Sequence, residues 1–260
     1  GTAFIRIAAA ADSTLQPEES ENFNVGVIWS PNDFQMKLDY WAVDYTNVIT
    51  KESAQGIVQR TPNSPQVIRQ DGTLVGVTTP FFNATFVETD GVDLEMSYSM
   101  DTDAGLLSLG FNATHYLSYE IPVKNANDVY VRTDVVGLFN HDNFARSLPD
   151  TKAVISANLI NGPHSVAAFA RHVAAYETTR ALSATATALG GFSQDIDSFT
   201  TLDLQYSYQV QSEDIILTVG VKNAFDEDVP VVFDDANWSY DPKHHDPRGR
   251  IFSLGLKYSL

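Results

Sequence analysis

Apolar and polar residues alternate with a period of two along much of the chain. The alternation is clearest in the last segment, where the apolar residues Phe252, Leu254, Leu256, Tyr258 and Leu260 are separated by Ser253, Gly255, Lys257 and Ser259. Successive side chains of a β-strand point to opposite faces of a sheet, so this pattern predicts a strand. We expect its apolar side chains to point away from the concave side of the sheet and its polar ones into it.

Eight more segments show the same alternation, at 23–29, 34–40, 92–100, 107–114, 151–160, 164–176, 202–210 and 215–222. They predict an all-β fold, an antiparallel meander of about nine long strands with no helix longer than a few turns. Roughly ten residues is the length that a tilted strand needs to cross a bilayer. Strands of soluble sandwiches average about five or six residues, so the length favours a transmembrane β-barrel.

The connections between these segments alternate in length. Short ones at 31–33, 101–105, 161–163 and 211–214 alternate with long ones at 46–87, 120–149, 178–198 and 223–249. Successive connections of an antiparallel meander lie on opposite sides, which puts all tight turns on one side. Outer-membrane barrels have this asymmetry, with short periplasmic turns and long extracellular loops. Inside the 46–87 connection, Asp71-Gly72 predicts a small hairpin.

The two faces of the predicted strands carry different residues. Aromatic residues lie on the apolar face near the short-turn ends, as in the girdles of membrane barrels: Trp29, Tyr98, Tyr206, Tyr208 and Tyr258. Charged residues lie on the opposite face, which we expect to form a polar wall around the lumen: Lys37, Asp39, Asp93, Glu95, Arg171, Asp203, Lys222 and Lys257.

Composition narrows the function. The net charge of -17 argues against nucleic-acid binding, which needs a basic surface. The chain has no Cys, which excludes disulfides, zinc–thiolate sites and cysteine nucleophiles. It has no apolar run long enough for a membrane helix. It starts at Gly1 without a signal peptide, and we interpret this start as a cut within a larger protein.

Three passages resemble the TonB-dependent receptors of Gram-negative outer membranes. Leu15-Gln16-Pro17-Glu18-Glu19-Ser20-Glu21-Asn22-Phe23 with Gly26 is similar to the family's LKPE-x-S-x-x-Y-x-x-G entry into a strand, and Gly91-Val92-Asp93-Leu94-Glu95 to its G-x-E/D-x-E strand. Asn223-Ala224-Phe225-Asp226 followed by Gly249-Arg250 is similar to its closing NLFD…GR pattern. Asn24 and Leu260 depart from the family, which often has Glu and usually ends in Phe at these places.

The resemblance implies a barrel of about 22 strands filled by a plug. Residues 1–260 would be its C-terminal part, with the plug absent, and in isolation they would form an open half-barrel. The implied function is active uptake of a scarce ligand, such as a siderophore, cobalamin, an oligosaccharide or a peptide, with TonB-supplied energy. Implied partners are outer-membrane lipid, the N-terminal plug, TonB through that plug and the small-molecule ligand, with no cofactor and no nucleic acid.

Two alternatives remain open at this stage. One is a passive porin or autotransporter-type barrel, which needs no plug. The other is a soluble carbohydrate-binding β-sandwich, because alternation alone does not separate the two fold classes.

The 223–249 connection holds the candidate binding residues. It contains three aromatic residues and a histidine pair that could contact a ligand at a barrel mouth: Phe233, Trp238, Tyr240, His244 and His245. Its many carboxylates lack the spacing of a known metal loop, so we expect a solvated acidic loop and no metal site. No nucleophile or phosphate-binding motif is present in the sequence, and we expect no enzymatic activity.

Overall fold

The computed structural model describes residues 6–10, 14–51, 54–125, 129–140, 145–210, 215–232 and 240–258. Within these ranges one sheet path is formed by β2 (Glu19–Trp29), β3 (Phe34–Lys51), β5 (Thr73–Thr102), β6 (Gly105–Lys124), β10 (Thr151–Asn161), β11 (His164–Val173), β14 (Phe199–Val210), β15 (Ile215–Lys222) and β16 (Ile251–Tyr258). Consecutive strands of this path pair antiparallel. The predicted nine-strand meander is therefore confirmed.

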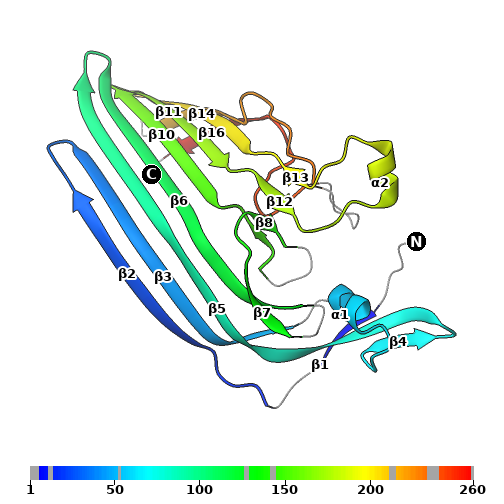
Figure 1. Cartoon of the computed structure of the whole chain (residues 1–260). Coiled ribbons are helices and arrows are strands. Elements are labelled where there is room, and N and C mark those ends of the chain that lie inside the picture. The colour runs from blue at the N-terminus through cyan, green and yellow to red at the C-terminus, as the bar shows by residue number, and fades with distance from the viewer. Residues whose placement is uncertain are drawn as a thin grey trace.

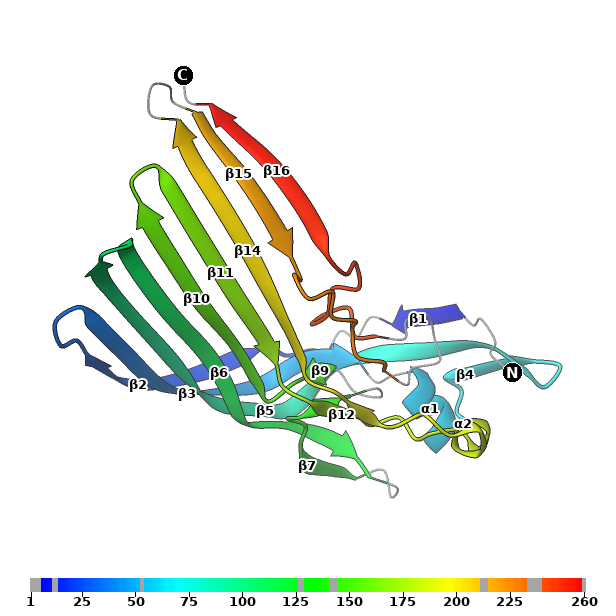
Figure 2. The ribbon, with the colours of Figure 1, turned by 90° about the horizontal axis from the view of Figure 1, so that it is seen from above.

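The sheet is open. Its order runs from β16 at one edge to β2 at the other, and these two strands do not pair. Figure 2 shows them as the two separate rims of a trough. A single curved sheet with free edges is part of a barrel, not a pair of facing sheets, so the sandwich alternative is wrong.

The tight turns gather at one end of the sheet, and the long loops with both helices gather at the other (Figure 1). We call these the turn end and the loop end. At the turn end Asn32 has a φ of 50° and Gly105 a φ of 117°. A Cβ on Gly105 would collide with the carbonyl oxygen of Ile160, so a glycine is required there. The predicted turn at 211–214 lies outside the described residues.

Polar and apolar side chains separate onto the two faces as predicted. Ser253 lies next to Gly220, and Gly255 lies next to Thr218, on one face of the sheet. On the same face the hydroxyl groups of Thr218 and Ser207 are 3.1 Å apart. The neighbouring apolar residues occupy the other face and are exposed there: Leu204, Tyr206, Val219, Phe252, Leu254 and Leu256. A broad apolar surface on the outside of a curved sheet is typical of a lipid-facing wall.

Three strands are much longer than the alternation predicted. β3 has 18 residues, β5 has 30 and β6 has 20, so the expected 46–87 and 120–149 connections are wrong in extent. Beyond the apolar band the strands continue because Val87, Ile121 and Val135 pack into a buried cluster that rewards further pairing. The predicted hairpin is confirmed. β4 (Val67–Gln70) pairs with β5 across Asp71 and Gly72, whose φ values are 50° and 79°.

Small elements surround this hairpin. α1 (Ala54–Arg60) packs Ile57 against Val67 and Val77, and β1 (Arg6–Ala10) pairs parallel to β5. The second helix, α2 (Ala184–Leu189), begins at Ser183, whose side chain accepts a hydrogen bond from the backbone N–H of Ala186. Neither of these short helices could span a membrane, and none of the described helices is long and apolar enough to do so.

The loop end holds a second, small sheet that the sequence did not predict. It joins β8 (Leu138–Phe139), β9 (Ser147–Leu148), β12 (Tyr176–Thr178) and β13 (Asp195–Ile196), with β8 and β12 parallel. β7 (Tyr130–Asp134) extends β6 beside it. Tyr176, Ile196 and Val232 form its buried core. We call this sheet together with residues 240–250 the loop body, since three separate connections pack into it.

Candidate functional site

Asp241 joins the three connections of the loop body. Its side chain is fully buried, at 0% exposure. It accepts hydrogen bonds from the hydroxyl of Ser147, from that of Tyr176 at 2.8 Å and from the backbone N–H of Lys243 at 3.0 Å. Burial and the nearby Asp241 charge raise the pKa of Tyr176, which keeps its hydroxyl a donor. The expectation of a solvated acidic loop is thus wrong for Asp241.

The two predicted histidines follow Asp241 in the chain. His244 is half-buried, with Nε2 3.3 Å from the carbonyl oxygen of Ser147. His245 is 4% exposed and packs against the rings of Tyr176 and Phe199, at 6.1 and 5.2 Å. Among the described residues, neither ring nitrogen of His245 has a hydrogen-bond partner. A ligand contact by His245 would therefore need this segment to move.

The other predicted ligand contacts are located less fully. Phe233 and Trp238 lie outside the described residues, and Tyr240 lies beside Asp241 at the start of the described segment. Ligand binding by these five residues stays a prediction. Within the described ranges, no group of three or more histidine or carboxylate side chains is placed to hold a metal ion.

Acidification is expected to loosen residues 240–250 from the loop body. Burial lowers the pKa of His244 and His245 below 6.5, although the charge of Asp241 partly opposes this, and Lys152 and Lys243 add to the shift at His244. The packed state therefore favours neutral rings. Its stability is fully present above pH 6.5 and falls below it, because the released state then binds protons that the packed state rejects.

Hydrogen exchange of residues 240–250 at about pH 7.5 and about pH 5.5, corrected for intrinsic rates, measures this effect. We expect less protection at the lower pH. A His244→Gln/His245→Phe double variant removes both titrating rings and should show little dependence on pH. Equal protection of the native segment at both values would refute the prediction.

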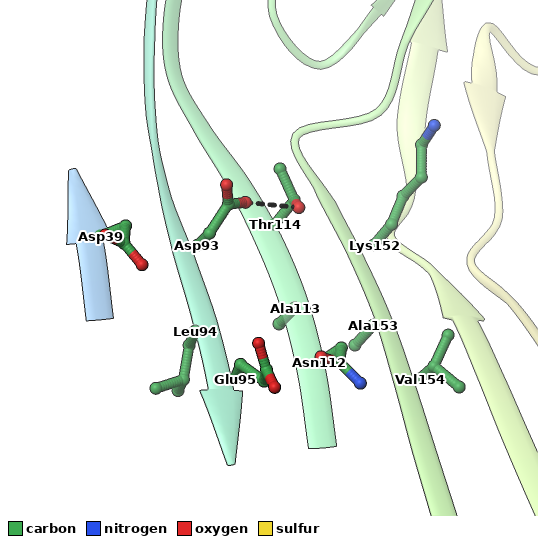
Figure 3. A pocket seen from close by; sticks show the side chains of 10 residues that line it. All are labelled: Asp39, Asp93, Leu94, Glu95, Asn112, Ala113, Thr114, Lys152, Ala153 and Val154. Carbon is green, nitrogen blue, oxygen red and sulfur yellow. Dashed lines mark hydrogen bonds between the residues drawn. The ribbon is translucent and has the colours of Figure 1, made fainter. Parts of the chain in front are cut away.

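A cavity of about 480 Å³ opens on the polar face at β3, β5, β6 and β10 (Figure 3). Asp93 accepts a hydrogen bond from the Thr114 hydroxyl at 2.6 Å, and Glu95 pairs with Lys37 at 3.2 Å. Several lining residues were predicted on the lumen wall, whereas Asn112, Thr114 and Lys152 were not singled out. The full lining is Asp39, Asp93, Leu94, Glu95, Asn112, Ala113, Thr114, Lys152, Ala153 and Val154.

Two carboxylates of this cavity are not neutralised. Asp39 and Asp93 lie directly opposite each other on paired strands, an arrangement that is destabilising for like charges. Neither forms an ion pair within the described part of the chain. The Asp39 carboxylate lies over Gly26, where any Cβ would collide with it. Gly26 therefore makes room for a charge that faces the lumen.

Gly91 has a similar role on β5. A Cβ there would lie 2.5 Å from Cζ2 of Trp41 and 2.7 Å from the carbonyl oxygen of His115. The Trp41 ring also meets Tyr116 edge-on, with centroids 5.5 Å apart. The glycine of the Gly91–Glu95 passage thus admits an indole ring on the polar face.

The Asn223–Asp226 passage links β15 to β16. Asn223 Oδ1 accepts from the N–H of Glu227 at 2.9 Å, and Asp226 Oδ1 accepts from the N–H of Arg250 at 2.7 Å. A Cβ on Gly249 would press on the Asp226 carboxylate. Asn223, Asp226 and Gly249 thus connect the segment after β15 to the segment before β16 at the loop end. We call these three residues the clamp, and we assign the passage a structural role.

Asp226→Ala is expected to destabilise this clamp by about 1 kcal/mol, a small value because its ion pair with Arg250 is about half exposed. Thermal unfolding of the full-length protein with the substitution measures the loss. Asp228→Ala, a neighbouring exposed carboxylate, is the matched control and should change little. Equal effects of the two substitutions would contradict the clamp.

Comparison with known proteins identifies the fold family. The family model described as TonB dependent receptor-like, beta-barrel, matches residues 3–224. The chain belongs to this family. The family consists of bacterial outer-membrane transport receptors rather than enzymes, so the outer-membrane location predicted from the sequence is confirmed. None of the curated proteins compared matches the chain.

Solved structures of the same architecture include three metal and siderophore receptors. The siderophore receptor PirA from Acinetobacter baumannii is 14% identical, with a TM-score of 0.60 over 95% of this chain and 32% of its own. The FrpB iron transporter from Neisseria meningitidis is 12% identical, with 0.61 over 97% and 33%. The copper transporter OprC is 17% identical, with 0.59 over 95% and 32%. The chain therefore spans about a third of the length of these structures.

Proposed function

We propose that this chain is the C-terminal part of an outer-membrane active transporter. The whole protein would take up a scarce small ligand with energy supplied by TonB. The observation that carries the proposal is the family match, combined with a polar concave face on which Asp39 and Asp93 form no ion pair among the described residues. Similar structures are described as siderophore, iron and copper proteins, which makes a metal or its chelate the first ligand class to test.

The partner proposed for the polar face is the plug. Asp39 and Asp93 face the lumen as opposed carboxylates that form no ion pair among the described residues, although Lys152 lines the same cavity. A basic side chain from a plug would relieve their repulsion, since an opposite charge nearby favours ionised carboxylates. A water-filled pore has no such requirement, so this arrangement favours the plugged transporter over the passive barrel.

The partner proposed for the convex face is lipid. Its exposed leucines, valines and aromatic residues form a continuous apolar surface that water would not favour. Of the five predicted girdle residues, Trp29, Tyr98, Tyr206 and Tyr258 are exposed on this wall, and Tyr208 is half-buried. The proposed ligand contacts in the 223–249 connection remain Phe233, Trp238, Tyr240, His244 and His245.

Uptake measurements in cells test the function. Cells that carry the full-length protein are offered radiolabelled ferric siderophores, copper and cobalamin, with and without a functional TonB. We expect accumulation of one ligand that requires both the receptor and TonB. Receptor-dependent accumulation that continues without TonB would support the passive barrel instead.

A double variant tests the proposed contact with the plug. Asp39→Asn/Asp93→Asn removes both lumen charges with little change in shape, and we expect it to lower TonB-dependent uptake while the outer-membrane level stays constant. Asp44→Asn, on the same strand but outside the cavity lining, is the control. Unchanged uptake in the double variant would exclude a role of this pair in the transport cycle.

A further inference from the structure

A second cavity lies on the polar face at its loop end. It has a volume of about 370 Å³ and lies between β11, β14 and β15 on one side and residues 244–251 on the other. Its lining combines an apolar group with several charges: Arg171, Val173, Phe199, Thr201, Asp203, Lys222, Asn223, His244, Asp246, Gly249 and Ile251. The loop body therefore covers this part of the wall.

Both carboxylates of the cavity already have cationic partners. Arg171 pairs with Asp203, whose other oxygen accepts from the N–H of Asn223 at 2.9 Å. The Asp246 carboxylate accepts hydrogen bonds from two nitrogens of Arg248, at 2.8 and 2.6 Å. This contact is the largest cause that lowers the pKa of Asp246 to about 2. Each carboxylate thus already has a cationic partner and has little capacity left for a ligand cation.

Lys222 is exposed and forms no ion pair within the described residues, although its charge contributes to the lowered pKa of Asp246. Arg171 lies across Asp203 from it, with its side chain 49% exposed. The lining holds two cations, Arg171 and Lys222, and two carboxylates, Asp203 and Asp246. Arg248, outside the lining, pairs with Asp246, and Arg171 pairs with Asp203, which leaves Lys222 without an ion pair although the chain as a whole carries a net charge of -17.

The rest of the lining is apolar or neutral. Phe199 is buried, and Val173 and Ile251 lie beside it in the lining. Thr201 stands opposite Arg171 in the strand register and offers a hydroxyl group. An apolar surface next to a donor-rich rim suits a ligand with an apolar body and one anionic end.

We propose that this cavity is a binding subsite for a small carboxylate whose charged end contacts Lys222 and Arg171. Its apolar body lies against Val173, Phe199 and Ile251. Lysine ammonium and arginine guanidinium groups both bind carboxylates through short, strong hydrogen bonds, and the guanidinium group of Arg171 can form two parallel ones. The inference rests on the proposed function and deepens it, because it names the chemistry of one part of the transported ligand.

Binding to the purified full-length protein in lipid nanodiscs tests the subsite separately from transport. The probe is 4-fluorobenzoate, followed by the broadening of its fluorine NMR signal, with empty nanodiscs as the blank. The matched probe 4-fluorobenzamide has the same shape without the charge. We expect the protein to bind the acid and to bind the amide at least fivefold more weakly.

Variants test whether Lys222 binds the anionic end of the probe. Lys222→Gln should weaken binding of the acid by roughly five- to tenfold, the scale of one charge-assisted hydrogen bond. Lys222→Arg should retain most of it, and Lys257→Gln, a lysine of the last strand outside the cavity, should bind like the native protein. Equal binding of acid and amide, no binding of either, or an unaffected Lys222→Gln would each overturn the proposal.

The outcomes of the two tests are independent. Loss of TonB dependence in cells would overturn the transporter while leaving fluorobenzoate binding intact. Absence of fluorobenzoate binding in a protein that still imports its ligand with TonB would overturn the subsite alone.

Discussion

Leu204→Arg is expected to lower the free energy of unfolding in a lipid bilayer by about 2–4 kcal/mol, the scale for a cation on the lipid face of a barrel. Leu204 lies in the middle of β14, between Ala168 of β11 and Val221 of β15, and is 40% exposed on the convex face. A guanidinium group there has no partner and would have to reach toward the interface. The proposed lipid contact makes this position costly.

Gln205→Arg is the matched control. Gln205 is the next residue on the same strand and faces the polar side, opposite Ala167 and Gly220. Its side chain is exposed there, so an arginine can reach water or a polar plug at little cost. Titration of the refolding of both full-length variants into bilayers with denaturant measures the difference. Equal losses would contradict the facing assigned to β14.

The strands could be predicted from the sequence because each one separates two different environments. A one-residue change of register would put Leu204 on the polar face and Asp203 on the apolar face, so the alternation specifies both strand and facing. The tight turns were predictable for a local reason too, since positive φ at Asp71, Gly72 and Gly105 favours residue types that mark turns.

The loop end could not be predicted in the same way. The strands of the small sheet have two or three residues, and the pairing of β8 with β12, which joins its two halves, brings together connections far apart in the chain. No periodic pattern fits such a short element. The length of β5 was also missed, because beyond the apolar band it is stabilised by the cluster of Val87, Ile121 and Val135 rather than by alternation.

The candidate site was predicted in part. The sequence placed Asp39, Asp93, Arg171 and Lys222 on one polar wall, because alternation reports which residues share a face. It did not divide them between two cavities, since that depends on the neighbouring strand and on the loop body. Asp241 looked like any other carboxylate of an acidic loop, and its burial arises from tertiary contacts alone.

The two cavities differ in charge along one wall. Within the described residues, the first has opposed carboxylates that form no ion pair although Lys152 also lines it, and the second has paired carboxylates and a lysine, Lys222, that forms no ion pair. The second lies at the loop end, beside the segment that carries His244. This difference fits the proposal that the wall contacts a plug at the first cavity and a ligand at the second. The loop body covers the second cavity, so its stability should govern the access of the ligand to that cavity.

Asp241→Ala is therefore expected to destabilise the loop body by on the order of 3 kcal/mol. The substitution leaves the hydroxyl groups of Ser147 and Tyr176 and the N–H of Lys243 without their shared acceptor in a buried place. Hydrogen bonds to a buried carboxylate are among the stronger ones, and stranded donors lose their solvation as well. Residues 240–250 should then separate from β9 and β12, and their amide protection should fall by about two orders of magnitude.

Hydrogen exchange of the full-length protein at neutral pH measures this loss, with the nine-strand sheet as the internal reference. Tyr176→Phe removes one donor, keeps the ring, and should cost about 1 kcal/mol. Asp246→Asn alters a carboxylate of the same segment that is half exposed and paired with Arg248, so its effect on protection should be small. If Asp241→Ala and Asp246→Asn change the protection equally, Asp241 does not hold the three connections together. If the sheet loses protection along with the loop body, the two unfold as one unit and the loop body is no separate cover over the cavity.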